Sequence, residues 1–214
     1  MKRDLVPVLE SAVRTDCAEI LLIGDEGKSP PAHVALDDPR VRVIGGPPDL
    51  AGKRNQALRE AAGSVVAYID DDALIPDGWF EALKAGFRDD AVGVVSGPSI
   101  LPSDATYWER VAQLVMQSTQ YTRRRYTFCQ KGDAAWWDVI GANFAFRRAA
   151  MLELGGCPTQ FLAVGDDMAM AWQMENAGWK IYYEPRAYVY HRPHGFRDQL
   201  CQIFYRIYIM MRWW

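Results

Sequence analysis

The 214-residue chain lacks several features that would assign it quickly to a class of protein. Its 4 cysteines lie far apart without a CxxC pair, which argues against a zinc ribbon or redox motif and is typical of a reducing compartment. Its formal net charge is only -3, so we expect no nucleic-acid partner. No apolar run approaches the roughly 20 residues needed to cross a bilayer, and no signal-peptide pattern follows Met1. We therefore expect a cytoplasmic protein.

Apolar runs that alternate with helix-like segments predict the fold class. Without repeats, low-complexity tracts or linkers, residues 1–214 read as a single α/β domain with a parallel or mixed sheet. Strands are predicted at 19–23, 41–44, 65–69, 92–97 and 180–183, and helices at 2–15, 50–62, 77–88, 104–122, 147–154 and 166–177. Residues 123–140 have no clean period and read as a loop.

Three consecutive carboxylates, Asp70, Asp71 and Asp72, directly follow the apolar run 65–69. A run that is apolar at nearly every position is typical of a strand buried on both faces. Ligands of open α/β sheets bind beyond the carboxyl ends of such strands. Three adjacent negative charges repel one another, and a divalent cation with oxygen ligands would offset that cost. A solvated acidic turn is the alternative interpretation.

A second acidic pair, Asp166 and Asp167, opens the helix predicted at 166–177. An Asp at a helix start is commonly a cap that suits the helix dipole. The functional alternative is a carboxylate held at a pocket mouth as a general base. Further along, His191 follows an apolar segment, and a neutral imidazole there is a candidate metal ligand.

Four motifs in order make the chain resemble the family 2 glycosyltransferases, which have the GT-A fold. Each is weak alone, but the series spans roughly residues 2–194. The motifs are Gly52-Lys53-Arg54-Asn55-Gln56-Ala57-Leu58, Ala67-Tyr68-Ile69-Asp70-Asp71-Asp72, Gly141-Ala142-Asn143-Phe144-Ala145-Phe146-Arg147-Arg148, and Phe161 to Asp167 with Ala177-Gly178-Trp179 and Pro185 to His191. The resemblance implies a three-layer α/β/α domain with a mostly parallel mixed sheet.

The resemblance also implies a metal-dependent inverting transfer of a sugar from a nucleotide-diphosphate donor to an acceptor hydroxyl. Asp72, Asp70 and His191 would bind Mn²⁺ or Mg²⁺, which neutralises the leaving diphosphate. Asp167 would take the proton from the acceptor, and Asp166 stands beside it in place of the family's usual Glu. The residues expected to contact the nucleotide sugar are Asp25, Lys53, Arg54, Asn55, Asp70, Asp71 and Asn143.

On this resemblance, residues 1–99 would form the nucleotide-binding half and residues 100–194 the acceptor and catalytic half. The acceptor stays open among a glycan, a lipid-linked and a protein acceptor. Residues 195–214 are predicted to form an amphipathic C-terminal helix, with apolar side chains at helical spacing from 200 onward. Such a helix would contact a membrane surface or a second copy, or pack on its own domain.

One departure from the family pattern affects the sheet. The family opens with an apolar strand, whereas Met1 here runs directly into the helix that should follow it. A central sheet position would then be unfilled, and neighbouring backbone groups would lose ladder partners. Either the sheet closes differently, another chain fills the gap, or the assigned start is too late. A non-catalytic GT-A-like binding or scaffolding domain, or a truncated glycosyltransferase, is therefore the alternative function.

Overall fold

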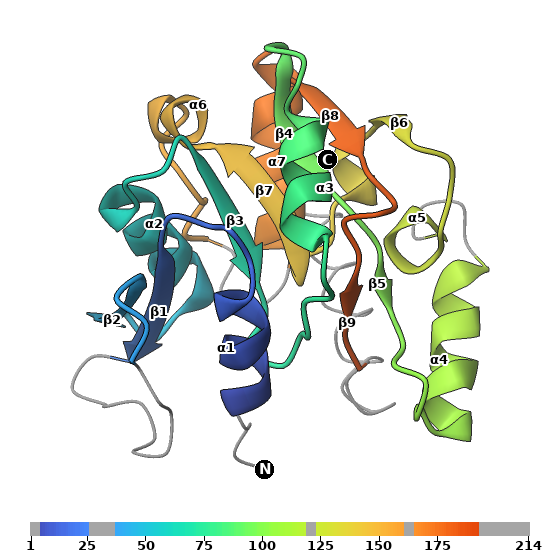
Figure 1. The fold of residues 1–214 in the computed structure, drawn as a ribbon. Coiled ribbons are helices and arrows are strands. Elements are labelled where there is room, and N and C mark those ends of the chain that lie inside the picture. Colours follow the sequence, from blue (N-terminus) through green and yellow to red (C-terminus); the bar gives the residue numbers. More distant parts are fainter. Residues whose placement is uncertain (1–4, 26–36, 119–122, 161–164, 193–214) are drawn as a thin grey trace.

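The computed structural model describes residues 5–25, 37–118, 123–160 and 165–192 (Figure 1). The helix expected at 195–214, and part of the motif that begins at Phe161, lie outside them. The helices are α1 (Val6–Val13), α2 (Leu50–Glu60), α3 (Trp79–Gly86), α4 (Tyr107–Gln117), α5 (Arg123–Tyr126), α6 (Arg148–Glu153) and α7 (Asp166–Asn176), with a 3-10 turn η1 (Trp136–Asp138). The strands are β1 (Ile20–Asp25), β2 (Val41–Gly46), β3 (Val65–Ile69), β4 (Val92–Ser96), β5 (Ser99–Ile100), β6 (Gly132–Ala134), β7 (Asn143–Arg147), β8 (Lys180–Tyr183) and β9 (Val189–Tyr190).

The main sheet has five strands in the order β3-β7-β4-β8-β6. Strands β4 and β8 are parallel, whereas β7 pairs antiparallel with both β3 and β4. Two further parallel pairs, β1-β2 and β5-β9, form separate two-stranded sheets. The expected mixed α/β arrangement is therefore confirmed, but β1 and β2 are not hydrogen-bonded to β3.

Apolar side chains fill both faces of the main sheet. One core cluster joins α2, α6 and α7 to the sheet through side chains such as Leu58, Met151 and Met170. The other cluster joins α3 to the opposite face through Trp79 and Leu83. Figure 1 accordingly shows α1 and α3 on one side of the strands and α7 on the other. The three layers explain why β4, inside the sheet, is buried at every position.

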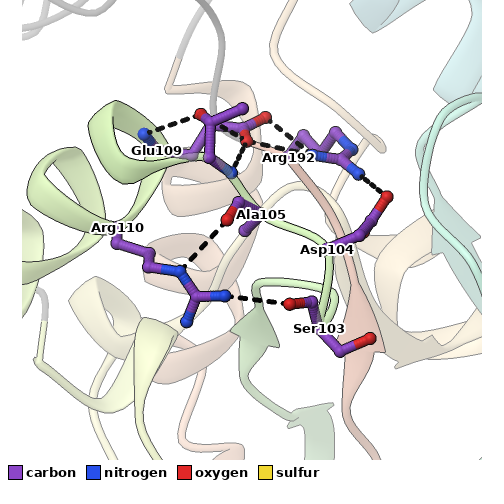
Figure 2. A network of polar contacts seen from close by, with 7 residues as sticks. Ser103, Asp104, Ala105, Glu109, Arg110 and Arg192 are labelled. Atoms are coloured by element: carbon purple, nitrogen blue, oxygen red, sulfur yellow. Dashed lines mark hydrogen bonds and ion pairs between the residues drawn. The ribbon is translucent and has the colours of Figure 1, made fainter.

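A polar network fixes the start of α4 against the end of the chain's described part (Figure 2). Thr106 and Glu109 form a capping box, in which the Thr106 N–H donates to the Glu109 carboxylate at 2.6 Å. Arg192 donates to the same carboxylate at 2.9 and 3.0 Å and to Asp104 at 2.6 Å. These ion pairs tie the segment after β9 to the first turn of α4.

Most predicted elements are present, and the main errors fall in the second half. The strands at 65–69 and 180–183 have the predicted bounds. The loop predicted at 123–140 is wrong, because this segment contains α5, η1 and the edge strand β6. The helix predicted at 104–122 is shorter, since α4 ends at Gln117. None of the helices among the described residues is long and apolar enough to span a bilayer.

Candidate active site and metal centre

Asp70, Asp72 and His191 come together beyond the carboxyl end of β3. The Nε2 atom of His191 lies 3.0 Å from Oδ1 of Asp72 and 3.7 Å from Oδ2 of Asp70. One ligand atom from each residue falls within 4.8 Å of the others, which suits a single cation. Two carboxylates and an imidazole match the donor atoms that Mn²⁺ accepts, and the carboxylates also suit Mg²⁺.

Backbone pairing positions these ligands although they lie far apart in the sequence. Leu74, just after the Asp triplet, exchanges two hydrogen bonds with Tyr190 at 2.8 and 2.9 Å. The next residue, His191, donates its N–H to the Ile100 carbonyl at 2.9 Å. These hydrogen bonds hold the turn after β3 against β9. The imidazole of His191, which follows β9, therefore lies beside the two carboxylates.

Burial and nearby charge act in opposite directions on Asp70. Burial raises the pKa of its carboxyl, while a charged His191 and the guanidinium of Arg54 oppose that rise. Removing a carboxylate from water disfavours its charged form, so the group benefits from a cation beside it. Asp71, between the two predicted ligands, is exposed and lines the same cleft.

The second carboxylate pair, Asp166 and Asp167, lies buried in the first turn of α7. Nη1 of Arg54 approaches Oδ2 of Asp166 at 2.9 Å, and the guanidinium stacks over the Phe144 ring at 4.8 Å. Burial raises the pKa of Asp166, and the Arg54 charge opposes it. The charges of Asp166, Asp167 and Asp70 outweigh burial at Arg54 and raise its pKa, so the guanidinium stays cationic.

Gly141 allows this close approach. A Cβ added there would lie 3.2 Å from both Nη2 of Arg54 and Oδ2 of Asp167. A side chain at this position would therefore press on the guanidinium and on the predicted base together. Arg54 was predicted to contact the nucleotide sugar; in this structure its guanidinium lies against the Asp166 carboxylate.

Asp25 and Lys53 form a separate polar contact at the end of β1. The ammonium of Lys53 lies 2.6 Å from Oδ1 of Asp25, and both residues line the cleft that also contains Asp70, Asp167 and His191. The cleft has a volume of about 1450 Å³. The structure thus brings most of the predicted site residues to one cavity.

Two predicted nucleotide contacts, Asn55 and Asn143, do not line this cleft. The Asn55 amide bonds to the backbone of Cys157, donating at 2.8 Å and accepting at 2.6 Å. The Asn143 amide is fully buried; it donates to the Ala187 carbonyl at 2.6 Å and accepts from Nε1 of Trp79 at 3.0 Å. In this structure both side chains hydrogen-bond within the chain, so the prediction that they contact the donor has no support from the cleft geometry.

Sequence reasoning missed part of the cleft wall. Gln113 and Met116 of α4 and Tyr126 of α5 line the cavity. Nε2 of Gln113 donates to the Tyr126 carbonyl at 3.1 Å, which holds the two helices together. Gln113 and Met116 fall in the helix predicted at 104–122, and Tyr126 falls in the stretch without a clean period; neither segment carried a motif that pointed to the cleft.

A scan against protein-family models matches residues 65–205 to the glycosyl transferase family group 2. The chain belongs to this family. Among curated relatives, a glucosyl-dolichyl phosphate glucuronosyltransferase of Haloferax volcanii is 23% identical over 172 residues, 73% of this chain and 52% of the relative. A pre-mycofactocin glycosyltransferase of Mycobacterium tuberculosis is 25% identical over 141 residues, 66% of this chain and 29% of the relative. The chain thus spans about half or less of the length of these relatives.

Solved structures share the fold of this family member. GalNAc-T7 with UDP, GalNAc and Mn²⁺ superposes with a TM-score of 0.63 at 19% identity, over 88% of this chain and 41% of the other. The mannosyltransferase PcManGT of Pyrobaculum calidifontis with GDP-Man and Mn²⁺ gives 0.62 at 20% identity, over 91% and 55%. The chain therefore has the GT-A fold that its motifs predicted.

Proposed function

We propose that this chain is a metal-dependent, inverting glycosyltransferase that moves a sugar from a nucleoside-diphosphate donor to an acceptor hydroxyl. Asp70, Asp72 and His191 converge, and Asp70 and His191 line the same cleft as the buried pair Asp166 and Asp167; this arrangement carries the proposal. The two groups come from elements far apart in the sequence, and a merely structural acidic turn would not need the second one.

Asp70, Asp72 and His191 would hold Mn²⁺ or Mg²⁺. The ion supplies Lewis-acid neutralisation of the leaving nucleoside diphosphate. The fit rests on three ligand atoms within 4.8 Å of one another and on the hard oxygen donors among them. Lys53, paired with Asp25 at the cleft, adds a cation on the same side for a phosphate oxygen.

Asp167 would act as the general base. Its neighbour Asp166 is engaged by Arg54, so Asp167 is the member of the pair available to an acceptor. It would take the acceptor hydroxyl's proton as that oxygen attacks the anomeric carbon and the bond to the diphosphate breaks. One displacement of this kind inverts the anomeric configuration. Asp167 is held by its position in the first turn of α7, and Gly141, which has no Cβ, leaves room for its carboxylate.

The donors of the solved relatives, UDP with GalNAc and GDP-Man, support a nucleotide sugar and Mn²⁺ as the first substrates to assay. The name of the Haloferax volcanii relative supports including a lipid-linked acceptor in the panel. A cytoplasmic location, with membrane association as the alternative, is part of the same proposal; residues 200–214, predicted to contact a membrane surface or a second copy, lie outside the described residues.

The test is transfer and donor hydrolysis with Mn²⁺ by three variants. Asp167→Asn removes the proposed base and should reduce turnover by at least about 100-fold. Asp72→Ala removes a proposed ligand of the cation that neutralises the leaving group and should also reduce turnover strongly. Asp90→Asn is the matched control, because the Asp90 side chain is fully exposed and lies outside the cleft. Proton NMR of the product should give the anomer opposite to that of the donor. Unchanged turnover in both Asp72→Ala and Asp167→Asn would refute the assignment.

A non-catalytic GT-A-like binding or scaffolding domain is the second candidate. The break between β1 and β3 favours it, because the nucleotide-binding half has a split sheet. Calorimetry with UDP, GDP and Mn²⁺, combined with the transfer assay, distinguishes the enzyme from the non-catalytic domain. Metal-dependent nucleotide binding with no turnover on any acceptor would support the binding domain, and turnover would exclude it.

A further inference from the structure

Two consecutive residues after β9, His191 and Arg192, contact two different parts of the molecule. Nε2 of His191 lies 3.0 Å from the Asp72 carboxylate in the candidate metal centre. Nη1 of Arg192 donates to both carboxylate oxygens of Glu109, at 2.9 and 3.0 Å, and Nη2 donates to Asp104 at 2.6 Å (Figure 2). One short stretch of backbone therefore carries both a proposed cation ligand and the ion pairs to the start of α4.

The backbone around these two residues is paired to the strand that leads into α4. The His191 N–H donates to the Ile100 carbonyl at 2.9 Å, which continues the parallel pairing of β5 with β9. The chain then runs from β5 through residues 101–106 into α4. The Arg192–Glu109 ion pair closes a ring made of β9, α4, residues 101–106 and β5. A shift of His191 would therefore reach the first turn of α4 through both the strand pairing and the ion pair.

Packing alone holds α4 weakly. Every residue of α4 is at least partly exposed, and Tyr107 and Trp108 are 70% and 74% exposed. Figure 1 shows this helix at the edge of the molecule. Further along the helix, the amides of Gln113 and Gln117 both donate to the Tyr126 carbonyl, at 3.1 and 2.8 Å, and so attach α4 to α5. Because α4 buries little apolar area, the polar contacts at its first turn contribute a large share of its placement.

The same helix forms part of the cleft wall. Gln113 and Met116, about one and two turns after Glu109, line the cleft that also contains Asp167 and His191. A rotation or shift of α4 about its first turn would move both side chains relative to that cleft. The placement of α4 would therefore set the shape of the space that an acceptor enters on its way to the proposed base.

We propose that Arg192 is a positioning residue that couples cation binding at His191 to the placement of α4, and through α4 to acceptor binding. The inference rests on the proposed function, from which it takes the cation and the acceptor. A bound cation would restrict the imidazole and the backbone of residues 191–192, and the Arg192 guanidinium would then hold Glu109 and Asp104 more firmly. Coupling of this kind is reciprocal, so an acceptor that contacts α4 would tighten cation binding by the same factor.

The experiment measures hydrogen exchange of the α4 amides by mass spectrometry, with and without saturating Mn²⁺, while calorimetry measures Mn²⁺ binding by each variant. In wild type, Mn²⁺ should slow this exchange by about fivefold, the upper range for partly exposed ion pairs. Arg192→Ala should still bind Mn²⁺ and lose the slowing, and Arg192→Lys, which keeps the charge, should restore part of it. Arg110→Ala is the matched control and should keep the slowing, because Arg110 belongs to the same network but donates to carbonyls of the segment before α4.

Turnover gives a second readout: Arg192→Ala should raise the acceptor KM by about fivefold and leave the donor KM unchanged. An equal Mn²⁺ response of α4 in wild type and Arg192→Ala would overturn the inference. Faster exchange in Arg192→Ala by the same factor with and without Mn²⁺ would show a merely structural contact, which also overturns it. Wild type that binds no Mn²⁺ would refute the metal centre and the coupling together, whereas Mn²⁺-dependent transfer without any change at α4 would overturn the coupling alone.

Discussion

Arg54 and Asp166 form an ion pair at 2.9 Å with only 5% and 4% of their side chains exposed. The pair joins the middle of α2 to the first turn of α7, and the guanidinium also stacks on Phe144. A buried charge is tolerated only when it is paired. Arg54 is therefore a positioning residue that fixes Asp166, and through it the neighbouring Asp167.

Replacing Arg54 should cost both stability and turnover. Arg54→Met leaves Asp166 buried without its partner, and breaking such a pair typically costs about 3–5 kcal/mol of unfolding free energy. Urea unfolding followed by tryptophan fluorescence measures the loss. The double variant Arg54→Met/Asp166→Asn removes both charges and should recover much of that loss. A double variant as unstable as the single one would contradict this account.

His191 should control cation affinity more than folding. His191→Ala removes one of the three predicted ligands; since loss of an outer-shell partner alone costs about 10- to 100-fold in metal affinity, the loss of a ligand should cost at least that. Calorimetric titration with Mn²⁺ is the measurement. Asp71→Asn is the matched control, because Asp71 is exposed and lies outside the ligand group. Equal Mn²⁺ affinity in wild type and His191→Ala would argue against the metal centre.

Asn143 should behave as a structural residue. Asn143→Ala leaves Nε1 of Trp79 and the carbonyl of Ala187 without their buried partner, and each such group costs about 1–3 kcal/mol. We expect a clear drop in unfolding free energy with unchanged donor affinity in the folded protein. Asn176→Ala, on the exposed end of α7, should stay within about 0.5 kcal/mol of wild type. A donor affinity that falls while stability is kept would restore Asn143 as a ligand contact.

Lowering the pH should destabilise the first turn of α4 by protonating Glu109. The Thr106 backbone N–H, with help from the Thr106 hydroxyl and Arg192, lowers the pKa of the Glu109 carboxyl below its usual value. A lowered folded-state pKa means that this stabilisation is present above the unfolded-state pKa and is lost as the pH falls through the folded-state pKa. The loss should be on the order of 1 kcal/mol, as for a helix cap. Glu109→Gln should flatten this part of the stability curve, and a parallel curve would contradict the assignment.

Cys157 should be unreactive until Asn55 is removed. Burial raises the pKa of the Cys157 thiol to about 12, so the thiolate is scarce at neutral pH. Asn55→Ala deletes both hydrogen bonds to the Cys157 backbone and should increase labelling of this thiol by a disulfide reagent several-fold. Mass spectrometry after timed labelling identifies the cysteine that reacts. Cys17 and Cys129 are half-buried rather than buried, so their labelling rates serve as internal references for that of Cys157.

The sequence predicted the elements whose signal is local. The apolar run 65–69 and its Asp triplet specify a buried strand with acids at its end, and the structure keeps those bounds. β6 was missed because its residues, Gly132, Asp133 and Ala134, have no apolar alternation, and an edge strand needs none. Most of the site residues that the motifs named line one cleft in the structure, because motifs in this order belong to one fold.

The roles of Arg54, Asn55 and Asn143 depended on contacts that no spacing reveals. Asn55 reaches Cys157, 102 residues away, and Asn143 reaches Trp79, 64 residues away. A polar residue in a motif is equally compatible with a ligand contact and with a buried hydrogen bond. The packing of α2 and β7 against distant parts of the chain brings these hydrogen-bond partners together.

The two hydrogen bonds between Leu74 and Tyr190 would couple the binding of a cation to the integrity of β9, the last strand among the described residues. Because the predicted ligands come from both sides of this bridge, an ion bound by them would act as a cross-link that exists only in the folded state. By mass action, such an ion at 100 times its dissociation constant would stabilise the fold by about 2.7 kcal/mol. The thermal midpoint would then report free cation concentration, and a chelator would first release β9 from the turn after β3.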